Sequence, residues 1–159
     1  MKHGRFLLIV VLLTIIQVTA LGYLKIFGVK PDLLLAGVIW ATLYFTPRWA
    51  LLYAFFIGLL KDTFSATSFA LNIWLFPLWA ILIIRLSRKI IIEHNYTYAL
   101  LAFIVSLAHS VLTGLLLGFL GNLLPWGAWL RILFFGSLYN AATAVILINL
   151  LKKIFPQKS

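Results

Sequence analysis

The residues of this chain that could do acid–base or metal chemistry are few and far apart. Its 159 residues include three acids (Asp32, Asp62 and Glu93), three histidines and no cysteine. Metal sites and catalytic acid–base pairs need such groups in clusters. The sequence also lacks a His-Glu-x-x-His motif, a Gly-x-Ser-x-Gly motif and a glycine-rich phosphate loop. We therefore expect no enzyme, no metal site and no cofactor.

Asp62 is the strongest functional candidate. It ends an apolar run that begins at Trp49, and a carboxylate in a membrane helix is costly unless a partner satisfies it. Adjacent residues do not face each other on a helix, so Lys61 points elsewhere. The expected partners are Lys25, Lys30, Arg131 or a polar group such as Asn72. We expect residues 49–72 to organise the chain, and Asp62 either ties two helices together or contacts a partner protein.

Asp32 lies at the start of the second apolar run, directly after Pro31. Proline fits the first turn of a helix, and an acid there meets the positive end of the helix dipole. Asp32 is therefore expected first of all to cap a helix. Together with Gly58 and Asp62 of the next run, Pro31 and Asp32 make up the candidate partner-binding residues.

A stripe of small and polar residues marks the fifth apolar run. Ser106, Ser110 and Gly114 recur at helical spacing around His109, a pattern typical of close helix packing in membranes. A matching stripe on the last run consists of Gly136, Asn140 and Thr143. We expect these two helices to pack closely or to line an internal cleft, with His109 as a satisfied core residue rather than a proton relay.

The composition indicates an all-α integral membrane protein. Hydrophobic residues make up 64% of the chain and charged residues only 10%, against about 25% charged in soluble domains. The apolar runs do not alternate with polar residues, as the strands of a membrane barrel would. The net charge of +10 comes from cations between the apolar runs. There they set the topology and meet the lipid bilayer rather than nucleic acid.

Six transmembrane helices are expected in a single domain, residues 1–159. Their approximate bounds are 6–24, 33–46, 49–65, 69–84, 96–119 and 130–151. The first run is longer than a signal-peptide core, so we favour an uncleaved helix over a signal peptide. The second and third runs are short for a hydrocarbon layer of about 30 Å. They either span a thinned bilayer or dip in and return as a hairpin.

The cations predict the orientation of these helices. Nine fall on the side of both termini, namely Lys2, Arg5, Arg48, Arg85, Arg88, Lys89, Lys152, Lys153 and Lys158. Four fall on the other side, namely Lys25, Lys30, Lys61 and Arg131. Cytoplasmic loops of membrane proteins carry the excess of Lys and Arg, so both termini are expected in the cytoplasm.

Two segments, Pro31-Asp32-Leu33-Leu34-Leu35 and Gly58-Leu59-Leu60-Lys61-Asp62, resemble the rod-shape-determining protein MreD family. That family is similar in length, with six predicted spans and both termini inside. It has a Pro-Asp-Leu-Leu-Leu start to its second helix and a Gly-Leu-x-x-Asp-like end to its third. One departure is that Ser68-Phe69-Ala70 stands where the family often has glycine.

The resemblance implies a non-enzymatic scaffold in the bacterial inner (cytoplasmic) membrane, within the elongation (rod) machinery. Such a protein would bind MreC, a bitopic periplasmic protein. It would help to regulate lateral peptidoglycan synthesis and cell shape through a transpeptidase and a glycosyltransferase, with an indirect link to MreB filaments.

A second hypothesis comes from the same resemblance. The MreD fold is similar to that of the substrate-binding subunits of energy-coupling-factor vitamin transporters. Such a subunit would need an outward-facing pocket lined by polar and aromatic groups from loops one, three and five. These loops are expected to be short here, about 7, 6 and 10 residues, which favours the scaffold.

Overall fold

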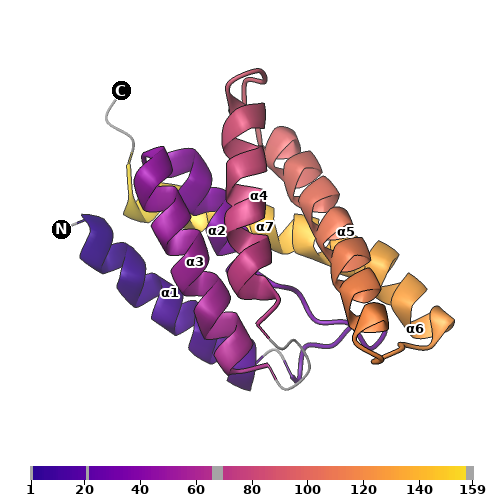
Figure 1. The fold of residues 1–159 in the computed structure, drawn as a ribbon. Helices are drawn as coiled ribbons and strands as arrows, with labels where there is room; N and C mark the ends of the chain where they lie inside the picture. Colours follow the sequence, from indigo (N-terminus) through magenta and orange to yellow (C-terminus); the bar gives the residue numbers. More distant parts are fainter. Residues whose placement is uncertain (1, 21, 66–69, 157–159) are drawn as a thin grey trace.

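The computed structural model describes residues 2–20, 22–65 and 70–156, and these ranges are helical with no β-strand (Figure 1). The helices in chain order are α1 (Lys2–Thr19), α2 (Leu33–Tyr44), α3 (Pro47–Thr63), α4 (Asn72–Ser87), α5 (Asn95–Phe119), α6 (Trp126–Arg131), the π-helical η1 (Ile132–Gly136) and α7 (Ser137–Ile154). Because α6, η1 and α7 follow one another without a break, they act as one long helix.

The connections between helices gather at two ends of the bundle (Figure 1). One end, here named the terminal end, holds the start of α1, the end of α7, residues 45–46 and residues 88–94. The opposite end, here named the loop end, holds the described parts of 20–32 and 64–71 together with 120–125. The chain therefore passes back and forth along the bundle, and the start of α1 and the end of α7 lie on the same side.

Helix α2 lies at the centre of the bundle. Every residue from Leu34 to Thr42 is buried, and α2 contacts α1, α3, α4, α5 and α7. A helix that is apolar all round has no face suited to water and lies either in a protein core or in a membrane; the contacts of α2 place it in the core of the bundle. The expectation that residues 49–72 organise the chain is therefore wrong. Helix α3 buries only one face, and its Leu52 and Phe55 are exposed.

Two helix bounds at the loop end differ from the expected ones. Helix α1 ends at Thr19 rather than at residue 24, because the following segment makes a tight turn of its own. In this turn Ile26 and Val29 exchange backbone hydrogen bonds of 3.0 and 2.9 Å around Phe27 and Gly28, which both have positive φ angles. Helix α4 begins at Asn72, and the expected start at residue 69 lies outside the described residues.

The last long helix also begins earlier than expected, at Trp126 instead of residue 130. Pro125 occupies the position before its first turn, where the missing N–H of proline costs nothing. The turn 132–136 is π-helical, a form that usually appears as a single turn inside a longer helix. As a result, Trp129 lies on a helix that packs against α5 rather than in an outer loop.

Among the described residues, three helices are long and apolar enough to cross a membrane: Lys2–Thr19, Asn95–Phe119 and Trp126–Ile154. Helices α2 and α4 are shorter, and the 12 residues of α2 rise only about 18 Å at 1.5 Å per residue. Large apolar side chains cover much of the outer surface, among them Leu8, Leu100 and Ile146, each more than half exposed. These features suggest a membrane protein.

Candidate functional site

The start of α2 carries the ion pair of this site. Asp32 caps the helix, because its Oδ1 accepts a hydrogen bond of 3.1 Å from the Leu35 amide. Its other oxygen, Oδ2, pairs with the ammonium of Lys61 from the last turn of α3. The side chains of Lys61 and Asp32 keep only 20% and 14% of their surface exposed. The cap expected at Asp32 is confirmed, and the pair also joins α2 to α3.

Electrostatics keep this carboxylate ionised. Burial alone would raise the pKa of Asp32, but the nearby Lys61 ammonium lowers it. Hydrogen bonds from Lys61 and from the Leu35 amide lower it further, so the pKa lies below the ordinary carboxyl value. An opposite charge and hydrogen bonds to the charged form both favour ionisation.

Amide side chains from two other helices hold the same turn. Asn140 on α7 accepts a 2.5 Å hydrogen bond from the Asp32 amide, and its Nδ2 donates to Ser106 Oγ on α5 at 2.6 Å. Gln17 on α1 donates to the Pro31 carbonyl at 3.2 Å and accepts from the Leu33 amide at 2.9 Å. The beginning of α2 is therefore anchored to α1, α3, α5 and α7 by polar contacts.

His109 on α5 is oriented by a tryptophan of α4. The indole Nε1 of Trp79 lies 3.1 Å from Nδ1 of His109. Because an indole N–H can only donate, Nδ1 is the acceptor, and in the neutral ring the proton sits on Nε2. The expectation that His109 is a satisfied core residue holds for Nδ1: the residue is 7% exposed.

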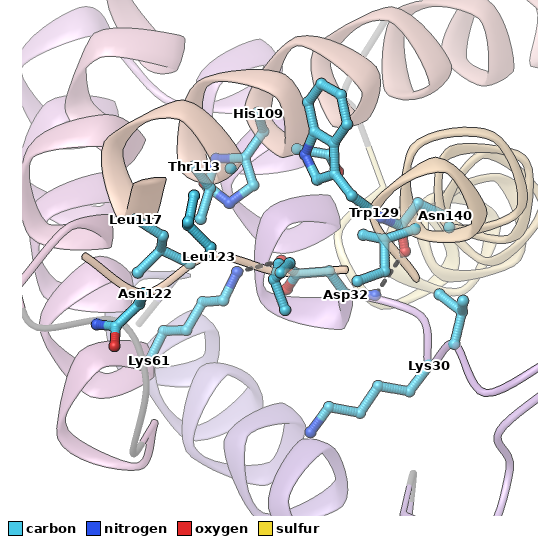
Figure 2. A pocket seen from close by; sticks show the side chains of 16 residues that line it. Lys30, Asp32, Lys61, His109, Thr113, Leu117, Asn122, Leu123, Trp129 and Asn140 are labelled. Carbon is cyan, nitrogen blue, oxygen red and sulfur yellow. Dashed lines mark hydrogen bonds and ion pairs between the residues drawn. The ribbon is translucent and has the colours of Figure 1, made fainter. Parts of the chain in front are cut away.

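A cavity of about 620 Å³ opens beside these residues at the loop end (Figure 2). Its walls come from α5, from the helix 126–154, from Lys61 of α3 and from the connections before α2 and after α5. Its polar lining includes Lys30, Asp32, Lys61, His109, Thr113 and Asn140. Figure 2 shows Lys61 reaching toward Asp32, with His109 from α5 on the same cavity.

The two small-residue stripes take different roles along the α5–α7 contact. Ser106 lies at the packed part of the contact, through its hydrogen bond with Asn140. Ser110, Gly114 and Gly136 line the cavity nearer to the loop end. Helices α5 and α7 thus pack closely over one stretch and separate into a cleft over the next.

Trp129 lies directly on Gly114. A Cβ atom added at residue 114 would fall 2.1 Å from the indole Nε1, so only glycine leaves room for the ring in this position. The indole Nε1 and the Thr113 hydroxyl are buried and have no hydrogen-bond partner among the described residues. Both residues line the cavity.

Asp62 and Gly58 occupy an internal contact between α3 and α4. The Asp62 carboxylate accepts hydrogen bonds from the Asn72 amide (3.2 Å), from Asn72 Nδ2 (2.7 Å) and from the Ile73 amide (2.8 Å), so it caps α4. A Cβ at Gly58 would lie 2.5 Å from the Asn72 carbonyl oxygen. Of the partners expected for Asp62, the structure thus places Asn72 against it.

Lys61 and Trp129 were not expected in this site. Lys61 does face away from Asp62, but that direction carries it to Asp32. The sequence did contain one signal for this pair: Asp32 and Lys61 have opposite charges, and both were expected at helix ends on the same side of the bundle. The last helix was expected to begin at residue 130, which leaves Trp129 outside it, and nothing in the sequence shows that the helix extends back to Trp126.

Metal binding and family relations add no further assignment. In residues 2–20, 22–65 and 70–156, no group of three or more His, Cys, Asp or Glu side chains is placed to hold a metal ion. The chain matches no protein-family model, no curated protein and no solved structure.

Proposed function

We propose that this chain is a non-enzymatic scaffold of the MreD type in the bacterial inner membrane. In this role it binds MreC and helps to regulate lateral peptidoglycan synthesis and cell shape. One observation carries the proposal: the two segments that resemble the MreD family meet in space. Asp32 of the first segment pairs with Lys61 of the second, so the two short motifs form one structural unit.

The distribution of charge supports the orientation that this function needs. Eight described cations lie on the segments near the terminal end: Lys2, Arg5, Arg48, Arg85, Arg88, Lys89, Lys152 and Lys153. Four lie toward the loop end: Lys25, Lys30, Lys61 and Arg131. With Lys158, which lies outside the described residues, these make up the 13 of the chain. The excess favours a cytoplasmic terminal end, and the loop end then faces the periplasm.

The four candidate partner-binding residues contribute to this scaffold through its shape. Pro31 and Gly58 are buried, and Asp32 and Asp62 each cap the start of a helix. We infer that they fix how α2, α3 and α4 are arranged, and that a membrane segment of the partner contacts the exposed apolar surface instead. Substitutions at these residues would then weaken partner binding only in proportion to the loss of folded protein.

Depletion in the native host tests the scaffold function. Removal of the chain should turn rod-shaped cells round, and re-expression should restore their width. Gly127→Ala is a matched control, because a Cβ at Gly127 meets no atom within 4 Å; this variant should restore rods as well as the wild type does. Cells that keep a normal width after depletion would refute the proposal.

The cavity favours a second candidate function, a small-molecule-binding subunit like those of energy-coupling-factor transporters. The first and fifth connections contribute Lys30 and Asn122 to its lining, and Trp129 contributes an aromatic group. The short loops expected from the sequence had favoured the scaffold because they did not predict such a pocket. Native mass spectra of the purified protein decide between the two: a water-soluble small molecule bound in a one-to-one ratio would favour the transporter subunit.

A further inference from the structure

The lining of the cavity at the loop end presents hydrogen-bond donors that no described residue satisfies. The Thr113 hydroxyl and the Trp129 indole N–H are buried without a partner among the described residues. His109 uses Nδ1 to accept from Trp79, which leaves its Nε2–H as a donor on a residue that lines the cavity and is 93% buried. Buried polar groups are nearly always hydrogen-bonded. Two such unpartnered donors, with the Nε2–H of His109 on the same cavity, therefore indicate an acceptor-rich occupant.

The charges on the lining indicate the sign of that occupant. Lys30 and Lys61 both line the cavity, against one carboxylate, that of Asp32. Both oxygens of Asp32 are already engaged, one by the Leu35 amide and one by Lys61. The remaining donor capacity of the ammonium groups suits an anionic group such as a phosphate or a carboxylate.

An apolar groove of about 350 Å³ adjoins the cavity. The two share Gly114, Leu123, Leu124 and Trp129 in their linings, so the indole forms the partition between them. The other walls of the groove are apolar and open outward, with Phe119 88% and Trp126 76% exposed. Such an exposed apolar surface suits an acyl chain, whereas the lining of the cavity carries the charged groups.

We propose that the cavity and the groove together bind one lipid-like amphiphile. Its anionic head, a phosphate or a carboxylate, lies in the cavity against His109, Thr113 and Trp129. Its apolar tail passes the Trp129 partition into the groove between α5 and α6. This inference goes beyond the scaffold function and does not depend on it, because a protein that fails to bind MreC could still hold the amphiphile.

Native mass spectrometry of the delipidated protein in detergent tests the proposal, with three probes added separately. Dioleoyl phosphatidic acid offers an anionic phosphate and tails, dioleoyl phosphatidylcholine offers the same tails with a zwitterionic head, and inorganic phosphate offers the anion alone. We expect one molecule of phosphatidic acid per chain, bound at least tenfold more tightly than either other probe. Equal binding of phosphatidylcholine, or of inorganic phosphate, would overturn the proposal.

Two substitutions separate ligand binding from folding. Thr113→Val and Trp129→Phe each remove a donor that has no partner among the described residues, so neither should lower the thermal stability of the empty chain. Each should weaken phosphatidic acid binding about tenfold, as expected for one hydrogen bond to a charged group. The matched control is Thr143→Val, since the Thr143 hydroxyl bonds carbonyl groups of its own helix.

The binding affinities of these variants can refute the proposal. If Thr113→Val and Trp129→Phe bind phosphatidic acid as tightly as the wild type and Thr143→Val do, the head does not lie in this cavity and the assignment is wrong. If a water-soluble small molecule from the cell occupies the cavity and phosphatidic acid does not displace it, the proposal that this site binds an amphiphile is also wrong.

Discussion

The ion pair between Asp32 and Lys61 should contribute measurably to stability, and Asp32→Asn isolates that contribution. Asparagine keeps an oxygen that can accept the cap hydrogen bond from Leu35, now 3.1 Å long, so the start of α2 remains capped. Only the negative charge is lost. Lys61→Met is the reciprocal change, because it removes the ammonium and retains a flexible apolar stem.

The expected magnitude follows from how little of the pair remains in contact with solvent. Exposed ion pairs contribute about 0.2–1 kcal/mol, but these side chains are only 14% and 20% exposed. Removing one partner of a fully buried pair costs about 3–5 kcal/mol. Discounting for the solvent access that remains, we expect each single substitution to lower the free energy of unfolding by about 2 kcal/mol. The double variant should lose about 2 kcal/mol rather than about 4, because the second change removes a charge that the first left unpaired.

Equilibrium unfolding in mild detergent measures the four proteins of this cycle. Lys25→Met serves as the control, because Lys25 is an exposed cation of the connection before α2 and should change the free energy by less than about 0.5 kcal/mol. Single effects that add up in the double variant would show that the two side chains do not interact, and the proposed joining of the two motifs would then fail.

Three further changes test the α3–α4 contact and the connection between these helices by thermal unfolding. Gly58→Ala should cost about 2 kcal/mol, because its Cβ would meet the Asn72 backbone at 2.5 Å, which cannot move aside as a side chain can; a melting temperature like that of Gly127→Ala would contradict this. Asp62→Ala should cost about 2 kcal/mol, since the start of α4 loses its cap, and an unchanged melting temperature would show that the cap is dispensable. Ala70→Gly should stabilise by about 0.5 kcal/mol, because Ala70 has a φ of 54° that favours glycine; a lower melting temperature would refute that reasoning.

The helices could be predicted because their signals are local. Long apolar runs broken by charge, glycine and proline determine where a helix can exist, and the expected second helix at 33–46 is close to the observed Leu33–Tyr44. Asp32 could be predicted as a cap for the same reason, since the cap and the amide that it binds are three residues apart.

The arrangement of the helices could not be predicted in the same way. Nothing in the run 33–46 distinguishes a helix at the centre of a bundle from one that faces lipid, because both are apolar on every side. The role of α2 depends on contacts with α1, α3, α4, α5 and α7. The pairing of Asp32 with Lys61 spans 29 positions and depends on that arrangement.

Only part of the candidate site could be predicted from the sequence. The stripes around His109 and Asn140 indicated where two helices approach each other, because small residues at helical spacing permit close contact. Predicting the cavity requires three facts that the spacing of residues along the sequence does not give. These are the extension of the last helix back to Trp126, the position of the Trp129 indole on Gly114, and the donation from Trp79 that orients His109.

The most direct test of the scaffold function is the recovery of MreC with this chain. The tagged protein is purified from host membranes in mild detergent, with Gly127→Ala in parallel, and the MreC that co-elutes is quantified. We expect MreC in a fixed ratio to the wild type and to Gly127→Ala alike. A folded, monodisperse chain that elutes without MreC would contradict it.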